Sequence, residues 1–234
     1  MTYRSIKLLS HYTILAKDGE IGKIHDFFFD DTTWTIRYLV VDTRRWLPGR
    51  KVLISPVAVG KTDWGSKQFV LNLTRDQVRK SPDINTDKPI SLQRQIELHD
   101  YYVWPYYWAT GGFVPVYPPP VMPPPEKKAR QTAQSDAERH NPYLRSTKEV
   151  IGYHIQARDG EIDHVEDFLI DEKRWVLCYM VVDTRNWLPG RKVLVSPEWI
   201  KYVIWTDKKL SINLTKEMVK NGPEYSPTEP MSQD

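Results

Sequence analysis

Apolar positions in the first third of the chain follow the short runs that are typical of β-strands. Asp18-Gly19 is a strong hairpin dipeptide, because glycine tolerates positive φ. Pro56 ends one run, and the pattern becomes helical over residues 74–80, with Thr74 as N-cap and Pro82 as the stop. Runs rich in β-branched and aromatic residues cover 14–17, 20–30, 34–41, 51–55, 57–64 and 68–73. These features predict a small, mainly β unit that ends in a short helix.

The same pattern returns 141 residues later, without a gap, from Arg4/Arg145 to Pro82/Pro223. Setting 3–82 against 144–223 gives 37 identities in 80 pairs. The run from Val40 to Leu53 differs from its copy at one position, Arg45 against Asn186. A period this long indicates two globular domains and not a solenoid. Five or six short strands with tight turns in each domain predict two small, closed or nearly closed β-barrels.

We therefore expect a first barrel at residues 3–98, a linker at 99–143, a second barrel at 144–225 and a disordered tail at 226–234. The linker contains two proline triplets, which favour polyproline II, and then a charged stretch expected to be disordered. Its first part carries a dense aromatic run, which consists of Tyr101, Tyr102, Trp104, Tyr106, Tyr107 and Trp108. These aromatics are expected either to pack on the barrels, with the prolines as a stiff spacer, or to be recognition residues for a partner.

Charge and composition narrow the classes of function. The formal net charge is +3 and the basic residues are spread along the chain, so nucleic acid is an unfavoured partner. One cysteine, Cys178, cannot form an internal disulfide, and a half-buried filler is the favoured reading of it. The N-terminus enters the first repeat directly, and no apolar stretch reaches about 18 residues. We expect a cytoplasmic protein, with peripheral attachment to the inner membrane through the aromatic run as the alternative.

The shared run Asp-Gly-Glu-Ile, then Val-Val-Asp-Thr-Arg and Trp-Leu-Pro-Gly-Arg-Lys-Val-Leu, resembles the PRC-barrel family. That family includes the cytoplasmic domain of the photosynthetic reaction-centre H subunit and the C-terminal domain of the ribosome-maturation factor RimM. Tandem bacterial members, with an aromatic linker between two barrels, are the most similar. The resemblance implies a small barrel that serves as an assembly platform and brings no catalytic residues. From this sequence we expect neither the membrane helix of the H subunit nor the N-terminal domain of RimM.

Known catalytic motifs are absent from the sequence, so we predict neither an enzyme nor a bound cofactor. The histidines do not correspond between the repeats: His25 aligns with Glu166, and His164 with Lys23. A duplicated metal site would tend to keep its ligands in both copies. The local group of His164, Glu166 and Asp167 is therefore interpreted as the polar face of a strand, and no metal site is predicted.

The loops that the repeats share are the better candidates for a partner surface. The structural interpretation is that Asp42 accepts backbone hydrogen bonds or pairs with an arginine; the functional one is that the loop docks a partner. The two tryptophan loops would then form a barrel–barrel or homodimer contact, since equivalent surfaces can meet isologously. The candidates are Asp42, Arg44, Trp46, Leu47 and Arg50, with their copies Asp183, Arg185, Trp187, Leu188 and Arg191.

The leading expectation is a non-catalytic interaction or scaffold protein that assembles with itself or with a larger complex of protein partners. Two alternatives come from the resemblance alone. The H subunit implies an accessory of a membrane electron-transfer or light-harvesting complex, and RimM implies an accessory factor in ribosome or RNA maturation.

Overall fold

The computed structural model of the 234-residue chain describes residues 2–43, 46–47, 50–86, 90–110, 144–184, 191–226 and 231–232. It divides into two compact units. The first-repeat unit is Ser10–Arg145, and the second-repeat unit combines Met1–Leu9 with Ser146–Asp234. The predicted disorder at 126–141, like most of the 226–234 tail, lies outside the described residues. None of the described helices is long and apolar enough to cross a membrane; the longest has 11 residues.

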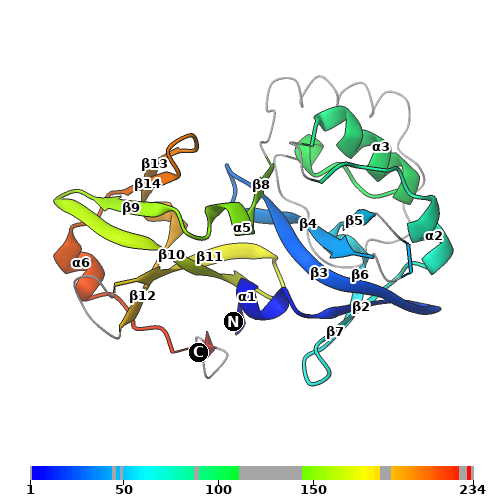
Figure 1. Cartoon of the computed structure of the whole chain (residues 1–234), viewed down its shortest axis with the longest axis horizontal. Coiled ribbons are helices and arrows are strands. Elements are labelled where there is room, and N and C mark those ends of the chain that lie inside the picture. Colours follow the sequence, from blue (N-terminus) through cyan, green and yellow to red (C-terminus); the bar gives the residue numbers. More distant parts are fainter. Residues whose placement is uncertain are drawn as a thin grey trace. The chain divides into compact units, whose positions relative to one another are not determined.

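The first-repeat unit is a mixed sheet with the strand order β6-β7-β2-β3-β4-β5 (Figure 1). The parallel pair is β2 with β7; the other pairs along this order are antiparallel. Its strands are β2 (Thr13–Ala16), β3 (Gly19–Asp30), β4 (Thr35–Asp42), β5 (Lys51–Ile54), β6 (Val59–Asp63) and β7 (Gln68–Leu71). As predicted, Asp18-Gly19 turns the chain between β2 and β3, and Gly19 has φ 142°.

The second-repeat unit repeats this order as β13-β14-β9-β10-β11-β12. Its strands are β9 (His154–Ala157), β10 (Gly160–Asp171), β11 (Val176–Asp183), β12 (Lys192–Val195), β13 (Ile200–Ile204) and β14 (Lys209–Ile212). A two-residue strand, β15 (Met231–Ser232), pairs with β1 (Thr2–Ser5), so part of the predicted disordered tail is a strand. The prediction of a mainly β chain is confirmed, while the strand pairings that the structure describes do not close either sheet into a ring.

Short helices end each repeat, as predicted. Thr74 caps α2 (Arg75–Lys80) with a full capping box. Its hydroxyl accepts from the backbone N–H of Gln77, and the side-chain oxygen of Gln77 accepts from the backbone N–H of Thr74. Thr215 caps α6 (Lys216–Lys220) with its hydroxyl alone, which accepts from the Met218 backbone N–H at 3.2 Å. The other helices within the described residues are α1 (Ile6–Leu9), α3 (Leu92–Tyr102) and α5 (Thr147–Val150), with 3₁₀ turns η1 (Pro56–Ala58), η2 (Tyr107–Thr110) and η3 (Pro197–Trp199).

The first strand of each repeat lies in the unit of the other repeat. β1 pairs with β10, and Leu144 and Arg145 of β8 (Leu144–Ser146) belong to the unit of their partner β3. Equivalent ion pairs accompany the exchange, since Arg4 contacts Glu172 at 2.8 Å and Arg145 contacts Asp31 at 3.2 Å. The predicted boundaries of 3–98 and 144–225 therefore differ from the structural units. Residues 3–9 continue the first repeat in sequence, yet they complete the second-repeat unit.

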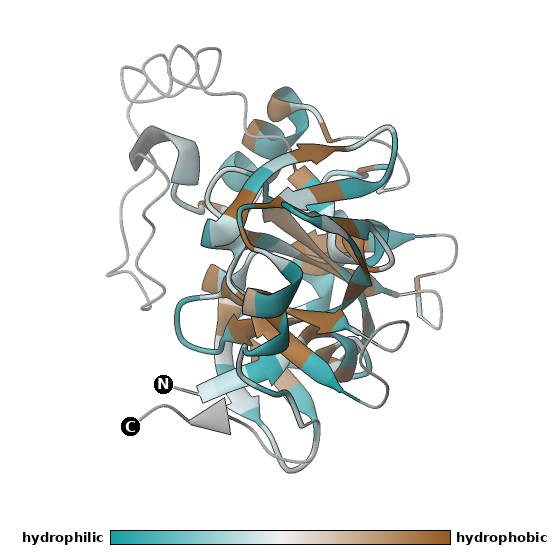
Figure 2. Ribbon diagram, turned by 90° about the vertical axis from the view of Figure 1, so that its left-hand side faces the viewer, coloured by the Kyte–Doolittle hydropathy of each residue, from teal (hydrophilic) through white to brown (hydrophobic). Residues whose placement is uncertain are grey.

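The second half of the longest strand in each unit is buried throughout, at Asp26–Asp30 in β3 and at Asp167–Asp171 in β10. Phe27 and Phe29 of β3 are fully buried in the first-repeat unit, and Phe168 of β10 is fully buried in the second. Figure 2 shows hydrophobic residues concentrated on the strands, whereas turns and helix surfaces are mostly hydrophilic. Successive side chains of a strand point to opposite faces, so these consecutive buried residues show that both faces of the strands are covered.

Candidate functional site

The shared loop after β4 is held by contacts inside its own unit. The Thr43 hydroxyl donates to the Arg50 carbonyl at 2.7 Å, and in the copy Thr184 donates to the Arg191 carbonyl at 2.6 Å. Both threonines are fully buried. These bonds close the loop at its base. Thr43, which lies between the predicted candidates Asp42 and Arg44, thus has a structural role that the sequence did not reveal.

Trp46 and Arg50 both contact the end of the first repeat. The guanidinium of Arg75 lies 4.7 Å from the centre of the Trp46 ring, and that of Arg79 lies 5.7 Å away. Arg50 donates to the carbonyl of Arg79 at 2.8 Å, and also to the carbonyls of Ser81 and Pro82. Cation–π contacts and charge-assisted hydrogen bonds of this kind fix the loop against α2.

The other predicted loop residues fall into three groups. Leu47 is partly exposed, and Arg191 forms an ion pair with Glu224 at 3.2 Å. Asp42 is partly exposed at the end of β4, whereas its copy Asp183 is fully buried. Arg44, Arg185, Trp187 and Leu188 lie outside the described residues. Trp46 and Arg50 thus both contact residues of α2. Asp183 differs from its copy Asp42 in being fully buried.

The aromatic run packs within the first-repeat unit, in agreement with the packed alternative. Trp104, Tyr106, Tyr107 and Trp108 are buried, while Tyr101 is exposed and Tyr102 is partly exposed. The Tyr102 ring stacks on Trp104 at 4.2 Å, and Tyr106 stacks on Trp108 at 5.2 Å. Helix α3, which the sequence reading missed, starts this segment with Ser91 as its N-cap. The Ser91–Arg94 cap is the signal in the sequence that could have revealed it.

A buried histidine joins this segment to the sheet. The Tyr38 hydroxyl lies 2.8 Å from His99 Nε2, and His99 Nδ1 lies 2.8 Å from the Pro105 carbonyl oxygen. Because a carbonyl oxygen only accepts, Nδ1 carries the proton and Nε2 accepts from Tyr38. Burial lowers the pKa of His99 from 6.5 to about 4. The ring is therefore neutral at pH 7 and acts as a fixed hydrogen-bond bridge, with both nitrogens occupied.

The same network holds a buried ion pair. Arg37 lies 3.1 Å from Asp30 and 4.1 Å from the centre of the Tyr107 ring, and the Arg37 and Asp30 side chains are each 4% exposed. Burial raises the pKa of Asp30, but hydrogen bonds from Thr32 and the charge of Arg37 outweigh it and lower the pKa below its usual value. In the second repeat Cys178 replaces Arg37, and burial raises the pKa of its thiol. Cys178 is therefore a half-buried packing residue, as the sequence indicated, and not an activated nucleophile.

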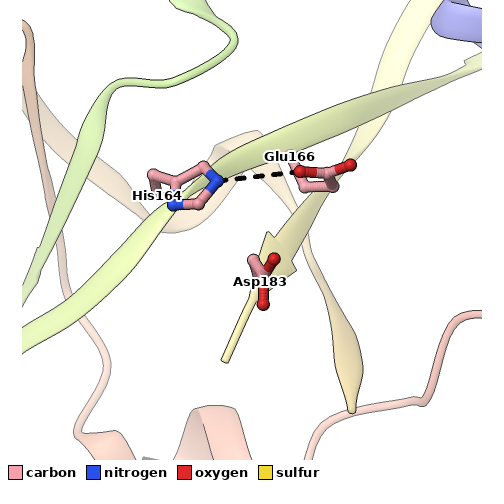
Figure 3. A group of neighbouring side chains, drawn as sticks. All are labelled: His164, Glu166 and Asp183. Atoms are coloured by element: carbon pink, nitrogen blue, oxygen red, sulfur yellow. Dashed lines mark ion pairs between the residues drawn. The ribbon is translucent and has the colours of Figure 1, made fainter. Parts of the chain in front are cut away.

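The predicted polar group of His164, Glu166 and Asp167 separates in the structure. Asp167 instead holds the exchanged N-terminal segment: its carboxylate accepts from the Ser5 hydroxyl and, at 3.1 Å, from the Lys7 amide. Asp183 takes its place beside the other two (Figure 3). One ligand atom from each of His164, Glu166 and Asp183 lies within 4.8 Å of the others. The antiparallel pairing of Val165 with Val182 brings Asp183 to β10, a long-range contact that local spacing could not predict.

An exposed apolar group follows η3 in the second-repeat unit. Trp199 is 45% exposed, and Tyr202 and Ile204 on β13 are 51% and 37% exposed. Tyr202 and Ile204 share one face of the strand, opposite Ser211 and Lys209 of β14. The first repeat has Ala58, Lys61 and Asp63 at these positions.

No family model matches the chain. An uncharacterized protein from Deinococcus radiodurans is 32% identical over 74 residues, which cover 32% of this chain. The match spans 26% of that relative, so it indicates shared ancestry for a segment only.

Proposed function

We propose that the chain is a non-catalytic interaction protein built from two barrels of the PRC type. The proposal of barrels rests on the strand order. In each unit the two ends of that order, β5 and β6 or β12 and β13, are consecutive along the chain and joined by a single 3₁₀ turn. A connection this short favours a sheet that curls into an open barrel, whose two end strands come near each other without pairing. The sequence resemblance supports the same architecture.

The observation that carries the interaction role is the apolar group Trp199, Tyr202 and Ile204. Aromatic residues are enriched at the centres of protein interfaces, and exposed apolar patches mark interaction sites. The equivalent positions of the first repeat are small or charged, so the fold does not require apolar side chains there. A surface that one copy makes apolar and the other copy makes polar is best explained by a partner that binds one copy.

The position of this group favours a partner that supplies an extended segment. Among the strands that the structure describes, β13 pairs with β14 alone and ends the strand order. An edge strand offers unpaired backbone groups to an added strand, and alternate side chains give the specificity. Tyr202 and Ile204 are two such alternate side chains.

The test exchanges these residues for those of the first repeat. Tyr202→Lys with Ile204→Asp should reduce recovery of the native partner by about tenfold, because hot-spot aromatics dominate interface energies. The matched control is Lys61→Ala with Asp63→Ala on the first-repeat unit, which should leave recovery unchanged. Recovery is measured by quantitative mass spectrometry of affinity-purified complexes.

The identity of the recovered protein then separates the alternatives. A membrane electron-transfer subunit would support the role suggested by the H subunit, and a ribosomal protein would support the RimM-like role. Recovery of this chain itself would support a homo-oligomer. Equal recovery of every protein by the Tyr202→Lys, Ile204→Asp variant and the wild type would contradict the proposed surface.

A further inference from the structure

The second-repeat unit brings together three side chains of metal-ligating types where the end of β11 meets the middle of β10. His164 and Glu166 come from β10, and Asp183 is the last residue of β11 (Figure 3). Their ligand atoms lie within 4.8 Å of one another, and His164 Nε2 lies 3.6 Å from Glu166 Oε2. One imidazole nitrogen and two carboxylates are a donor set that suits a divalent transition metal such as Zn²⁺.

A fourth residue orients the histidine. Asp163 is buried, and its Oδ1 lies 2.5 Å from His164 Nδ1. A carboxylate accepts a hydrogen bond, so Nδ1 is the donor and Nε2 is free to ligate in the neutral ring. Metal-bound histidines characteristically donate their second nitrogen to a carboxylate in this way. The contact with Asp163 involves none of the other proposed ligands. It leaves Nε2, the nitrogen that faces Glu166, as the atom that would bind the metal.

The lysines around Glu166 occupy its other oxygen. Lys7 Nζ lies 2.6 Å and Lys192 Nζ 3.3 Å from Glu166 Oε1. Glu166 Oε2 is therefore the oxygen that faces His164. The two ammonium groups hold the carboxylate in position and also offset part of the negative charge around the site. The expected affinity is accordingly moderate, well below that of a closed structural zinc site.

The side-chain exposures fit a site that metal and water can reach. The His164 side chain is 29% exposed and that of Glu166 is 21% exposed, whereas Asp183 is fully buried. Water can therefore reach the site past His164 and Glu166 and complete the coordination shell of a metal, as it does at open zinc sites.

The first repeat provides the contrast. Gly22, Lys23 and His25 stand where the second repeat has Asp163, His164 and Glu166, and only Asp42 matches Asp183. In that copy Lys23 is the cross-strand partner of Asp42, so a lysine replaces the ligating imidazole. The plain alternative for the second repeat is a protonated His164 that forms ion pairs with Asp163 and Glu166.

We propose that His164, Glu166 and Asp183 form a binding site for a divalent transition metal in the second-repeat unit, with Asp163 as a positioning residue. The site belongs to the second repeat alone and is separate from the apolar group on β13.

The test is titration of the chelator-treated full chain with ZnCl₂ by isothermal calorimetry, together with Co²⁺ absorption spectra. The wild type should bind one equivalent of Zn²⁺ and give visible Co²⁺ bands. His164→Lys installs the residue of the first repeat and places an ammonium group beside Asp163 and Glu166. It should preserve the circular dichroism spectrum and the melting temperature without metal, yet abolish both signals. Asp163→Asn should weaken Zn²⁺ binding by about tenfold to a hundredfold, as loss of outer-shell carboxylates does.

The matched control is His154→Lys, because His154 is an exposed histidine of the same unit that pairs only loosely with Glu161 at 3.3 Å. Its Zn²⁺ affinity should equal that of the wild type. Binding of less than about a fifth of an equivalent by the wild type would overturn the proposal in favour of plain ion pairs. Binding that survives in His164→Lys would overturn it in favour of adventitious binding elsewhere on the chain.

Discussion

The two units share one strand order but differ in what packs against it. In the first-repeat unit, Arg37 and Tyr38 of β4 contact a buried segment of aromatic residues and His99. At the equivalent positions of β11, Cys178 and Tyr179 pack with Tyr3 and Tyr225. The residues that both repeats keep, such as Thr43/Thr184 and Thr74/Thr215, close loops and cap helices. Shared residues therefore build the scaffold, while unshared residues distinguish what each unit can bind.

The exchanged strand gives the largest expected effect. Deletion of residues 2–9 removes β1 and α1, whose Tyr3, Ile6 and Leu9 are buried. Loss of these side chains, at about 2 to 5 kcal/mol each, exceeds the stability of a small domain. Hydrogen exchange should show loss of protection in β10 and β11, with protection retained in β3 and β4. Deletion of 226–234 is the control and should keep β10 protected; equal loss in both units after the 2–9 deletion would contradict separate units.

The second-largest expected effect comes from breaking the buried ion pair between Arg37 and Asp30, which the second-repeat unit does not have. Arg37→Cys installs the residue of the second repeat and leaves the Asp30 carboxylate without its cation. Breaking a buried pair from one side costs about 3 to 5 kcal/mol, so the midpoint of the first-repeat unit in urea should fall. Cys178→Ala in the other unit should cost less than about 1 kcal/mol, because it removes one half-buried sulfur. Similar costs for the two changes would show that the network around Arg37 does not stabilise its unit.

The neutral His99 predicts a pH dependence confined to the first-repeat unit. Its pKa falls from 6.5 to about 4 on folding, so between those values the unfolded chain binds a proton that the folded chain excludes. The stabilisation is complete above pH 6.5 and is lost as the pH falls towards 4, by about 3 kcal/mol at most. Urea unfolding at pH 7.5, 5.5 and 4.5 measures this loss. His99→Gln should be less stable at pH 7.5 and nearly flat over this range; an unchanged slope in the variant would contradict the assignment.

The smallest effects come from the two equivalent ion pairs of the exchanged strands. Arg4→Ala and Arg145→Ala each break a partly exposed pair, worth about 0.5 kcal/mol. Double-mutant cycles with Glu172→Ala and Asp31→Ala isolate the pairwise energies. Coupling energies equal within error would support the equivalence of the two exchanges, and a coupling present in one unit alone would break it.

Local elements of the fold could be predicted from the sequence. The Asp18-Gly19 hairpin and the Thr74 cap depend on chemistry within a few residues, which the sequence displays directly. Helix α3 was missed because its apolar and polar residues do not form a clear stripe and its aromatics suggested a linker. Its stability comes from burial against the sheet, since tertiary packing supplies most helical stability.

The strand exchange could not be predicted, because the repeats offer nearly equal partners. Arg4 and Arg145 are identical and face Glu172 and Asp31, which are equivalent acids. Pairing within a repeat and pairing between repeats would satisfy the same pattern. The group of His164, Glu166 and Asp183 was likewise hidden, because Asp183 comes beside His164 only through the pairing of β10 with β11.

We propose that the second repeat carries an interaction surface that the first repeat lacks. The most direct test places a photo-crosslinking amino acid at position 202 and, in a second variant, at the equivalent position 61, and irradiates cells that express each. We expect a discrete adduct with one protein from position 202 and none from position 61. Equal adducts from both positions, or none from position 202, would contradict it.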